Sequence, residues 1–202
     1  MKNDRSSGQK GRPRSFDPDK ALDRALQVFW CKGYEGASLS DLTRAMRINR
    51  PSMYAAFGDK ERLFLKALDR YEQGPGAFVN AALSEPTARR VAERLLRGAA
   101  EALGNPDNPR GCLAVQGALA CGDEAKSVQR DLVSRRDKRE ALIRHRFQRA
   151  KAAGDLPRVS NPAHLAGFVV TVMEGMAVQA VSGANRRQLR GIAETALRAL
   201  AI

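Results

Sequence analysis

The sequence has few of the groups on which enzymes and metalloproteins depend. It contains two histidines, His145 and His164, which lie on separate predicted helices and have no neighbouring nucleophile signature. No glycine-rich phosphate-binding loop occurs, and no His/Cys set has the spacing of a metal site. Catalysis therefore has little support, and we expect no catalytic residue, no metal and no cofactor.

Cysteine and long apolar runs are also scarce. The three cysteines are an odd number, and the basic, polar N-terminus lacks the apolar stretch of a secretory signal. We therefore expect a reduced, cytoplasmic protein without a disulfide framework. The most apolar run, residues 165–181, is short for a membrane span and is interrupted by Glu174 and Gln179. We interpret it as a buried helix and expect no membrane contact.

Positive charge, by contrast, is in excess. The 202 residues carry a formal net charge of +13, so an acidic polymer is a natural partner. Apolar residues make up 43% and charged residues 28%, as is usual for a soluble globular protein. Residues 1–73 hold 15 Lys/Arg against 10 Asp/Glu, a net of +5 out of +13. Most of the surplus therefore lies in the rest of the chain.

Turn signals divide the chain into a tail and two helical domains. Residues 1–15 are rich in Gly, Ser, Lys and Arg and lack apolar periodicity, which predicts a flexible basic tail that can settle on DNA phosphates. A first domain over 16–73 ends at the Gly-Pro-Gly sequence of residues 74–76, and 74–202 forms the second. No stretch has strand alternation, so the expected fold is all-α, with helices in the second domain near 91–103, 112–121, 125–153, 162–181 and 185–200.

Residues 38–57 are the most informative stretch, because they predict two short helices joined by a tight turn. Ser38 and Asp41 form a capping-box-like pair at the first helix start, and Asn49 is a plausible N-cap for the second. Only Met53 and Phe57 face inward on the second helix. A short helix with few core residues and a free polar face is what a helix-turn-helix needs to enter the major groove of DNA.

The region from Asp17 to Glu72 resembles the DNA-binding domain of the TetR family of bacterial transcriptional regulators. The order and spacing match over more than fifty residues. One departure is Ala56, since many members carry His, Tyr or Asn there, so sequence preference rests more on Arg50 and Ser52. The residues that carry the resemblance are Ala25, Phe29, Gly33, Tyr34, Ser38, Leu39, Leu42, the run from Arg50 to Phe57, Lys60, Glu61, Leu63 and Phe64.

The predicted DNA contacts fall into two classes. Arg50 and Ser52 are the best candidates for base edges, where an Arg bidentate to guanine discriminates by roughly 1–3 kcal/mol. Phosphate contacts position the protein without specifying sequence. Tyr54 is either a phosphate contact, which we favour, or a half-buried aromatic that supports the motif. The full predicted set is Ser38, Thr43, Arg47, Arg50, Pro51, Ser52, Tyr54, Ala55 and Lys60.

The resemblance implies a homodimer that binds a palindromic double-stranded operator and pairs through its last two helices as a four-helix bundle. It also implies a pocket for a small-molecule effector among the C-terminal helices. Glu174 is the most distinctive candidate, because a carboxylate in an apolar run is costly unless it is paired with Arg, His or a cationic ligand. The candidate lining residues, each also consistent with a place in the core, are Cys112, Gln116, Phe147, Phe168, Met173, Glu174 and Met176.

Cys112 raises a second possible switch. The sequence Asn108-Pro-Arg-Gly-Cys112-Leu is similar to a motif in a TetR subgroup, some of whose members sense electrophiles or oxidants through a cysteine. A thiol near a helix start and beside Arg110 has its thiolate form favoured. The alternative is a small buried cysteine. Cys121 lies about half a helical circuit away on a continuous helix, which disfavours a Cys112–Cys121 disulfide.

We therefore predict a dimeric DNA-binding regulator, most simply a repressor released by a small molecule or by cysteine modification. Two alternatives stay open. One is a helical ligand-binding or scaffold protein whose DNA motif has decayed, although Arg50, Tyr54 and Lys60 are all present. The other is a non-specific basic DNA-binding protein. The ten Lys/Arg of residues 125–153 are interpreted as a solvated face rather than as a second nucleic-acid site.

Overall fold

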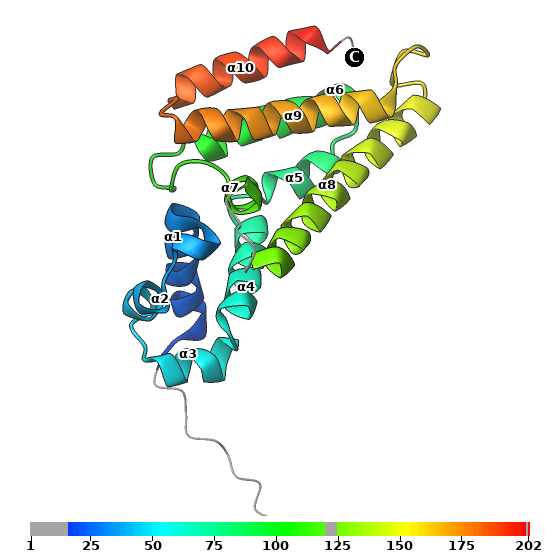
Figure 1. Cartoon of the computed structure of the whole chain (residues 1–202). Helices are drawn as coiled ribbons and strands as arrows, with labels where there is room; N and C mark the ends of the chain where they lie inside the picture. The colour runs from blue at the N-terminus through cyan, green and yellow to red at the C-terminus, as the bar shows by residue number, and fades with distance from the viewer. Residues whose placement is uncertain (1–15, 120–124, 201) are drawn as a thin grey trace, which may run out of the picture.

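A computed structural model of the chain describes residues 16–119, 125–200 and 202. All regular structure in these residues is helical. Helices α1–α4 form the lower end of the molecule, with α3 at its tip, and α6, α9 and α10 form the opposite end (Figure 1). The helices are α1 (Pro18–Gly36), α2 (Leu39–Met46), α3 (Arg50–Phe57), α4 (Lys60–Gln73), α5 (Phe78–Leu83), α6 (Ala88–Leu103), α7 (Leu113–Leu119), α8 (Lys126–Ala152), α9 (Pro162–Val181) and α10 (Arg186–Ala199).

Side-chain caps define the helix-turn-helix. The Ser38 Oγ accepts a hydrogen bond from the Asp41 N–H, and the Asp41 carboxylate accepts one from the Ser38 N–H, which completes a capping box at α2. Arg47 ends α2 in the left-handed conformation, and the Asn49 side chain caps α3 through the Ser52 N–H at 2.8 Å. Gly33, with a φ of 71°, interrupts α1 three residues before its end, a backbone conformation that glycine adopts at little cost. The sequence predicted both short helices and their caps correctly.

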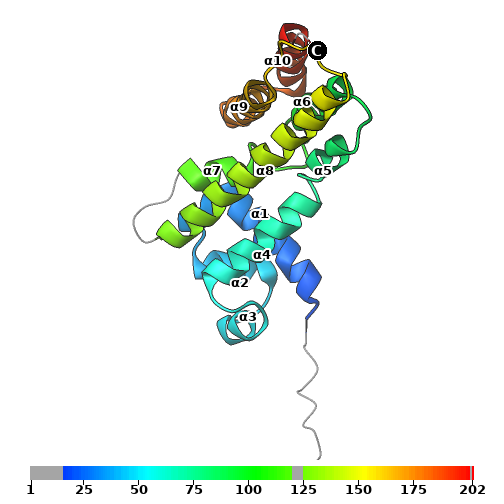
Figure 2. The ribbon, with the colours of Figure 1, turned by 90° about the vertical axis from the view of Figure 1, so that its right-hand side faces the viewer.

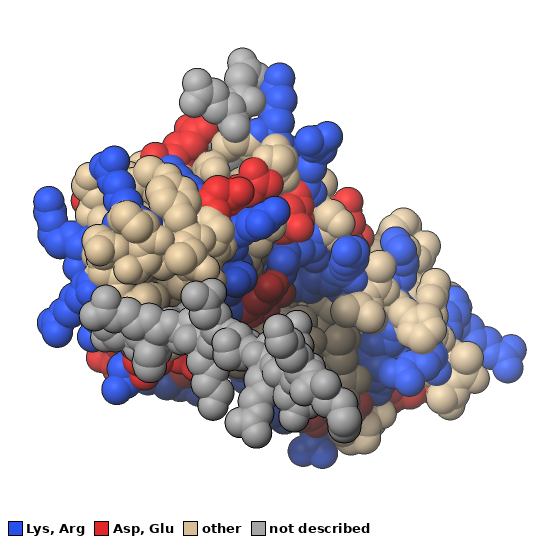
Figure 3. All heavy atoms as spheres, turned by 90° about the horizontal axis from the view of Figure 1, so that it is seen from below, with Lys and Arg blue, Asp and Glu red and all other residues tan. Residues whose placement is uncertain are grey.

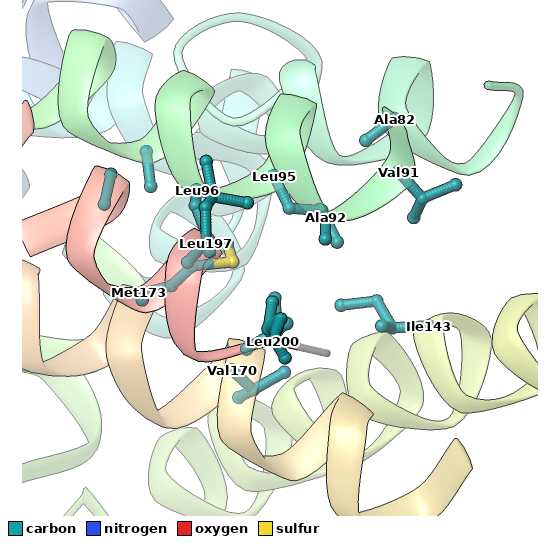
Figure 4. Packing of buried hydrophobic residues seen from close by; sticks show 14 of the residues in the cluster. Ala82, Val91, Ala92, Leu95, Leu96, Ile143, Val170, Met173, Leu197 and Leu200 are labelled. Carbon is teal, nitrogen blue, oxygen red and sulfur yellow. The ribbon is translucent and has the colours of Figure 1, made fainter. Parts of the chain in front are cut away.

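A second core lies at the other end of the molecule, where α6, α8, α9 and α10 meet. Side chains from these four helices point toward one another in Figure 4. α9 and α10 run side by side, as Figures 1 and 2 both show. α9 is long and apolar enough to cross a membrane by length and composition, but its inner side packs in this core. Its buried residues are Ala166, Val169, Val170, Met173, Met176, Ala177 and Ala180.

The core of the DNA-binding end includes residues from the second half of the chain. Leu113 and Ala114 of α7, together with Val128 and Leu132 of α8, are buried in the same cluster as Phe29 of α1. The indole N–H of Trp30 donates a hydrogen bond of 2.9 Å to the carbonyl of Gly111. The hydroxyl of Ser127 donates one of 2.9 Å to Glu61 on α4. The start of α8 is therefore attached to the DNA-binding helices by apolar and polar contacts.

The predicted helices differ from the observed ones in two places. α5 was not predicted, because its six residues are too few to show a periodic pattern. The predicted helix over 112–121 is observed as α7 from Leu113 to Leu119, and Cys121 lies outside the described residues, as does the predicted tail over 1–15. The remaining expected helices agree with α6, α8, α9 and α10 to within a few residues.

Two valines on α8 test whether this helix belongs to the core of the DNA-binding end. Val128 is fully buried there, whereas Val133 is 44% exposed. We expect Val128→Ala to lower the free energy of unfolding by about 2 kcal/mol, because two buried methyl groups are lost and a cavity remains. Val133→Ala, the matched control, should change it by less than about 0.5 kcal/mol. Chemical denaturation measures both values, and equal values for the two variants would contradict this packing.

Candidate DNA-binding interface and effector cavity

Helix α3 presents a small exposed face at the tip of the molecule. Met53 and Phe57 hold it to the core, with exposures of 0% and 5%, while Tyr54 is 47% exposed. Arg50, Pro51 and Ala55 are also exposed, and Ser52 is half-buried. One guanidinium nitrogen of Arg50 donates a hydrogen bond of 3.1 Å to the Ser40 hydroxyl, so this long side chain lies across the gap between α2 and α3. The helix thus offers side chains of both polar and apolar character to a groove.

The residues predicted to contact phosphates border this face. Ser38 is exposed at the start of α2, and the Thr43 hydroxyl is bound to the Leu39 carbonyl at 2.9 Å. Arg47 is exposed in the turn between α2 and α3, where a shallow hollow also includes Thr43 and Asn49. The underside of the molecule carries Asp and Glu as well as Lys and Arg (Figure 3). The distribution of charge alone therefore does not identify the predicted DNA-contacting surface.

Lys60 lies at the first position of α4, and its ammonium group is 4.5 Å from the centre of the Tyr34 ring. Partial burial lowers the pKa of Lys60, and the nearby Glu35 acts in the opposite direction. The Lys60 charge favours a phosphate at this position, although the Asp59 carboxylate already caps the helix start by accepting a hydrogen bond from the Arg62 N–H. The structure thus brings the predicted set onto one end of the molecule, and the individual contacts to DNA stay a prediction.

Behind the DNA-binding helices lies a cavity of about 420 Å³. Its size is within the range of small-molecule sites. Trp30 of α1 and Tyr71 and Glu72 of α4 line one side, and α8 and α9 line the other. The apolar part of the wall includes Phe78, Val79, Ala99, Ala102, Leu103, Val115, Leu142, Val170, Met173 and Ala177. Residues from α1 and α4, at one end of the molecule, and from α8 and α9 therefore bound this one cavity.

Charged groups from three helices meet at the wall of the cavity. Arg136 of α8 donates two hydrogen bonds to the Glu174 carboxylate of α9, at 2.8 and 2.7 Å. Arg135 pairs with Glu72 of α4 at 3.0 Å. Glu174 is thus paired within the chain, which was one of the two outcomes expected for this carboxylate. α8 links α4 to α9 through neighbouring arginines.

Cys112 faces the cavity next to Tyr71. The Tyr71 hydroxyl donates a hydrogen bond of 3.3 Å to the Cys112 Sγ. Burial, and then the neighbouring Cys112, raise the pKa of Tyr71 well above its ordinary value, so its hydroxyl stays protonated near neutral pH. Tyr71 also packs edge-on against the Trp30 ring, with ring centroids 4.7 Å apart. The Cys112 thiol, the Tyr71 phenol and the Trp30 indole therefore lie next to one another on the same wall of the cavity.

The structure divides the predicted effector-pocket residues into two groups. Cys112, Met173 and Glu174 line the cavity. Phe147 and Met176 are instead fully buried in the core, and Phe168 is 41% exposed on the outer side of α9. Gln116 turns back to donate a hydrogen bond to the Arg110 carbonyl. These four do not line the cavity, because the sequence pattern gives helix faces without showing which neighbour each face meets.

Several residues at the cavity were not predicted. Trp30 and Tyr71 line the cavity but were not among the predicted pocket residues, and the basic residues of α8 were interpreted as a solvated face. Arg135, Arg136, Lys138 and Arg139 instead line the cavity. The i,i+4 pair of Asp131 and Arg135, at 2.6 Å, is typical of an exposed helix face, so it gave no signal that this part of α8 lines a cavity.

Comparisons with known proteins match both halves of the chain. The family described as bacterial regulatory proteins, tetR family, matches residues 21–67, which contain the helix-turn-helix. The family described as tetracyclin repressor-like, C-terminal domain, matches residues 88–196. Together the two matched segments include α2 and α3 as well as most of the helices that form the cavity.

Individual relatives match over nearly the whole chain. The HTH-type transcriptional repressor ComR of Escherichia coli K12 is 33% identical over 94% of this chain and 91% of that protein. The repressor BdcR of the same strain is 30% identical over 89% and 86%. A solved structure of a cysteine mutant of the TetR family regulator CifR, complexed with 26-bp operator DNA, is 44% identical with a TM-score of 0.88, over 94% of this chain and 100% of that one. The chain therefore belongs to the TetR family and is a DNA-binding transcriptional regulator.

Proposed function

We propose that the protein is a homodimeric repressor that binds a palindromic operator and releases it when its cavity is occupied or Cys112 is modified. The observation that carries this proposal is the position of the cavity, which has Trp30 of α1 and Tyr71 of α4 in its wall. A molecule in the cavity would touch the helices that support α3. The repressors ComR and BdcR, and the operator complex of CifR, support the DNA-binding part.

In this proposal Arg50 and Ser52 read base edges in the major groove. Ser38, Thr43, Arg47, Tyr54 and Lys60 contact phosphates, and Pro51 and Ala55 allow close approach of α3 to the bases. The Arg50 guanidinium already reaches across to Ser40, so it would exchange one hydroxyl partner for a base. A single domain of this size contacts few base pairs, so specificity requires two copies about one helical turn or more apart.

The second copy is proposed to pair through α9 and α10. Phe168, Val178 and Ile192 are exposed apolar side chains on these helices. A Cβ placed on Gly175 or Gly191 would meet nothing within 4 Å, so both glycines leave room for a neighbouring helix. An apolar exposed face with small residues is suited to close helix packing in a dimer. The partner would be a copy of this chain, as is typical of the family.

Release is proposed to act through α8. The start of this helix is buried with α1 and α4, and Arg136 binds Glu174 on α9, which is part of the proposed dimer surface. A ligand that moves α8 would therefore change the position of the DNA-binding helices relative to the dimer interface. Modification of Cys112 would have a similar effect, because an added group on the Sγ would displace the Tyr71 hydroxyl and enter the cavity.

Two other functions compete with this proposal. A decayed DNA motif is disfavoured because Arg50 and Tyr54 are both present and exposed on α3, which lies at the tip of the molecule, and Lys60 begins the next helix. A non-specific DNA-binding protein would lack sequence preference and would have a salt dependence without a specific component. We propose no catalytic activity, since the relatives are transcriptional regulators, and we propose that the protein acts in the bacterial cytoplasm.

The roles of Arg50 and Lys60 can be separated by measuring binding to an operator recovered by selection from genomic DNA. Arg50→Ala should weaken operator binding by about 1–3 kcal/mol and reduce the preference over random DNA. Lys60→Ala should weaken binding to both DNAs alike and flatten the salt dependence by about one unit of slope. Titrations at several salt concentrations measure both effects. Equal losses on operator and random DNA for both variants would contradict the division of roles.

The proposed dimer surface can be tested with two exposed valines. Val178 on α9 is 48% exposed, and Val159 in the preceding loop is 94% exposed. Val178→Asp should convert the dimer to a monomer at micromolar concentration, because an unpaired carboxylate from each subunit would be buried in the proposed interface. Val159→Asp, the control, should leave the dimer intact. Light scattering after size exclusion gives both masses, and a dimeric Val178→Asp variant would place the interface elsewhere.

A further inference from the structure

The charged side chains around the cavity are unevenly paired. Arg135 is held by three carboxylates, with the Asp69, Glu72 and Asp131 oxygens at 2.7, 3.0 and 2.6 Å. The side chains of these carboxylates are 35–51% exposed, so solvent screens this group. The positive charge of Arg135 is fully compensated by these three carboxylates, so Arg135 offers no free cation to a ligand.

A second, more enclosed group of charged side chains consists of Arg136, Arg139 and Glu174, and it has a surplus of positive charge. Glu174 is 21% exposed, and both of its oxygens accept hydrogen bonds from Arg136. Arg139, which is 23% exposed, has Glu174 as its one ion-pair partner among the described residues, at 3.8 Å. Two guanidinium groups therefore share one carboxylate, and that carboxylate is already engaged in a bidentate pair with the other arginine.

We propose that Arg139 binds the carboxylate of an amphipathic, singly charged effector whose apolar body fills the rest of the cavity. This inference rests on the proposed function and names the chemical class of its effector. A guanidinium offers five N–H donors in a planar fork that matches a carboxylate. One carboxylate would balance the surplus charge of the group formed by Arg136, Arg139 and Glu174, and would leave the Arg136–Glu174 pair intact. Phe78, Val79, Leu142, Val170 and Met173 supply an apolar wall for the remainder of the molecule.

The same contacts disfavour a cationic effector. An ammonium group would have to compete with Arg136 for Glu174, or with Arg135 for carboxylates that are exposed to solvent. Residues 165–181 contain no basic residue, which disfavours an anionic group against the α9 wall, so the cations available to a carboxylate come from the α8 wall.

Trp30 is the single tryptophan of the chain and lines the cavity, so its fluorescence reports occupancy. We suggest titrating the full-length protein with octanoate, octan-1-ol and octylammonium, and then with benzoate, benzyl alcohol and benzylammonium. The two series differ in shape, and within each series only the polar end changes. Arg139→Gln removes one positive charge from the cavity wall. Arg144→Gln removes one from the exposed side of the same helix and is the matched control.

We expect the carboxylate of at least one series to bind about 10- to 100-fold tighter than its alcohol, as for charge-assisted hydrogen bonds. Arg139→Gln should remove this preference, and Arg144→Gln should keep it. The inference is overturned if the alcohol or the ammonium compound binds as tightly as the carboxylate in both series. It is also overturned if neither carboxylate binds at millimolar concentration, or if Arg139→Gln retains the preference.

Operator binding is measured separately, without ligand, on DNA recovered by selection. A protein that binds its operator but shows no carboxylate preference would keep the proposed repressor function and lose only this inference. A protein that prefers carboxylates but selects no operator would lose the proposed function and keep the ligand class. The two failures are therefore distinguishable.

Discussion

The structure depends on one shared core, in which α7 and the first turns of α8 pack against the DNA-binding helices. Leu113, Val128 and Leu132 are fully buried there, and the Trp30 indole fixes the preceding loop through the Gly111 carbonyl. Because protein interiors are closely packed, this contact cannot be altered continuously without a cost in free energy. In the proposed function, a change in the position of α8 would therefore be transmitted to α1 and α4, which pack against it in this core.

Hydrogen bonds and ion pairs also join α8 to α4 and to α9. α8 is joined to α4 by Ser127–Glu61 and Arg135–Glu72, and to α9 by Arg136–Glu174. The two arginine pairs, Arg135–Glu72 and Arg136–Glu174, border the cavity that lies between the two halves of the molecule. A ligand there can bias the DNA-binding helices only by its differential affinity for two arrangements of these contacts.

The sequence was sufficient to predict the all-α fold, the helix-turn-helix and its caps, because these depend on local spacing and turn chemistry. Ser38, Asp41 and Asn49 cap helices within three residues of themselves. The cavity was predicted only in part, because it is formed by residues distant in sequence. Periodicity places Phe147 and Phe168 on helix faces, but only the packing of α8 and α9 shows that one lies in the core and the other outside. The sequence did not single out Arg136 and Arg139 either, because a run of basic residues does not show which side chains face a neighbouring helix.

Coupling between the cavity and the DNA-binding surface is tested most directly by linkage. If an added group in the cavity releases the operator, then the bound operator must disfavour that group by the same factor. We would measure the equilibrium extent of Cys112 modification by oxidised glutathione, with exposed Cys31 as the internal reference. We predict that saturating operator lowers modification at Cys112, whereas random DNA of equal length does not. Equal modification of Cys112 with both DNAs would contradict the coupling.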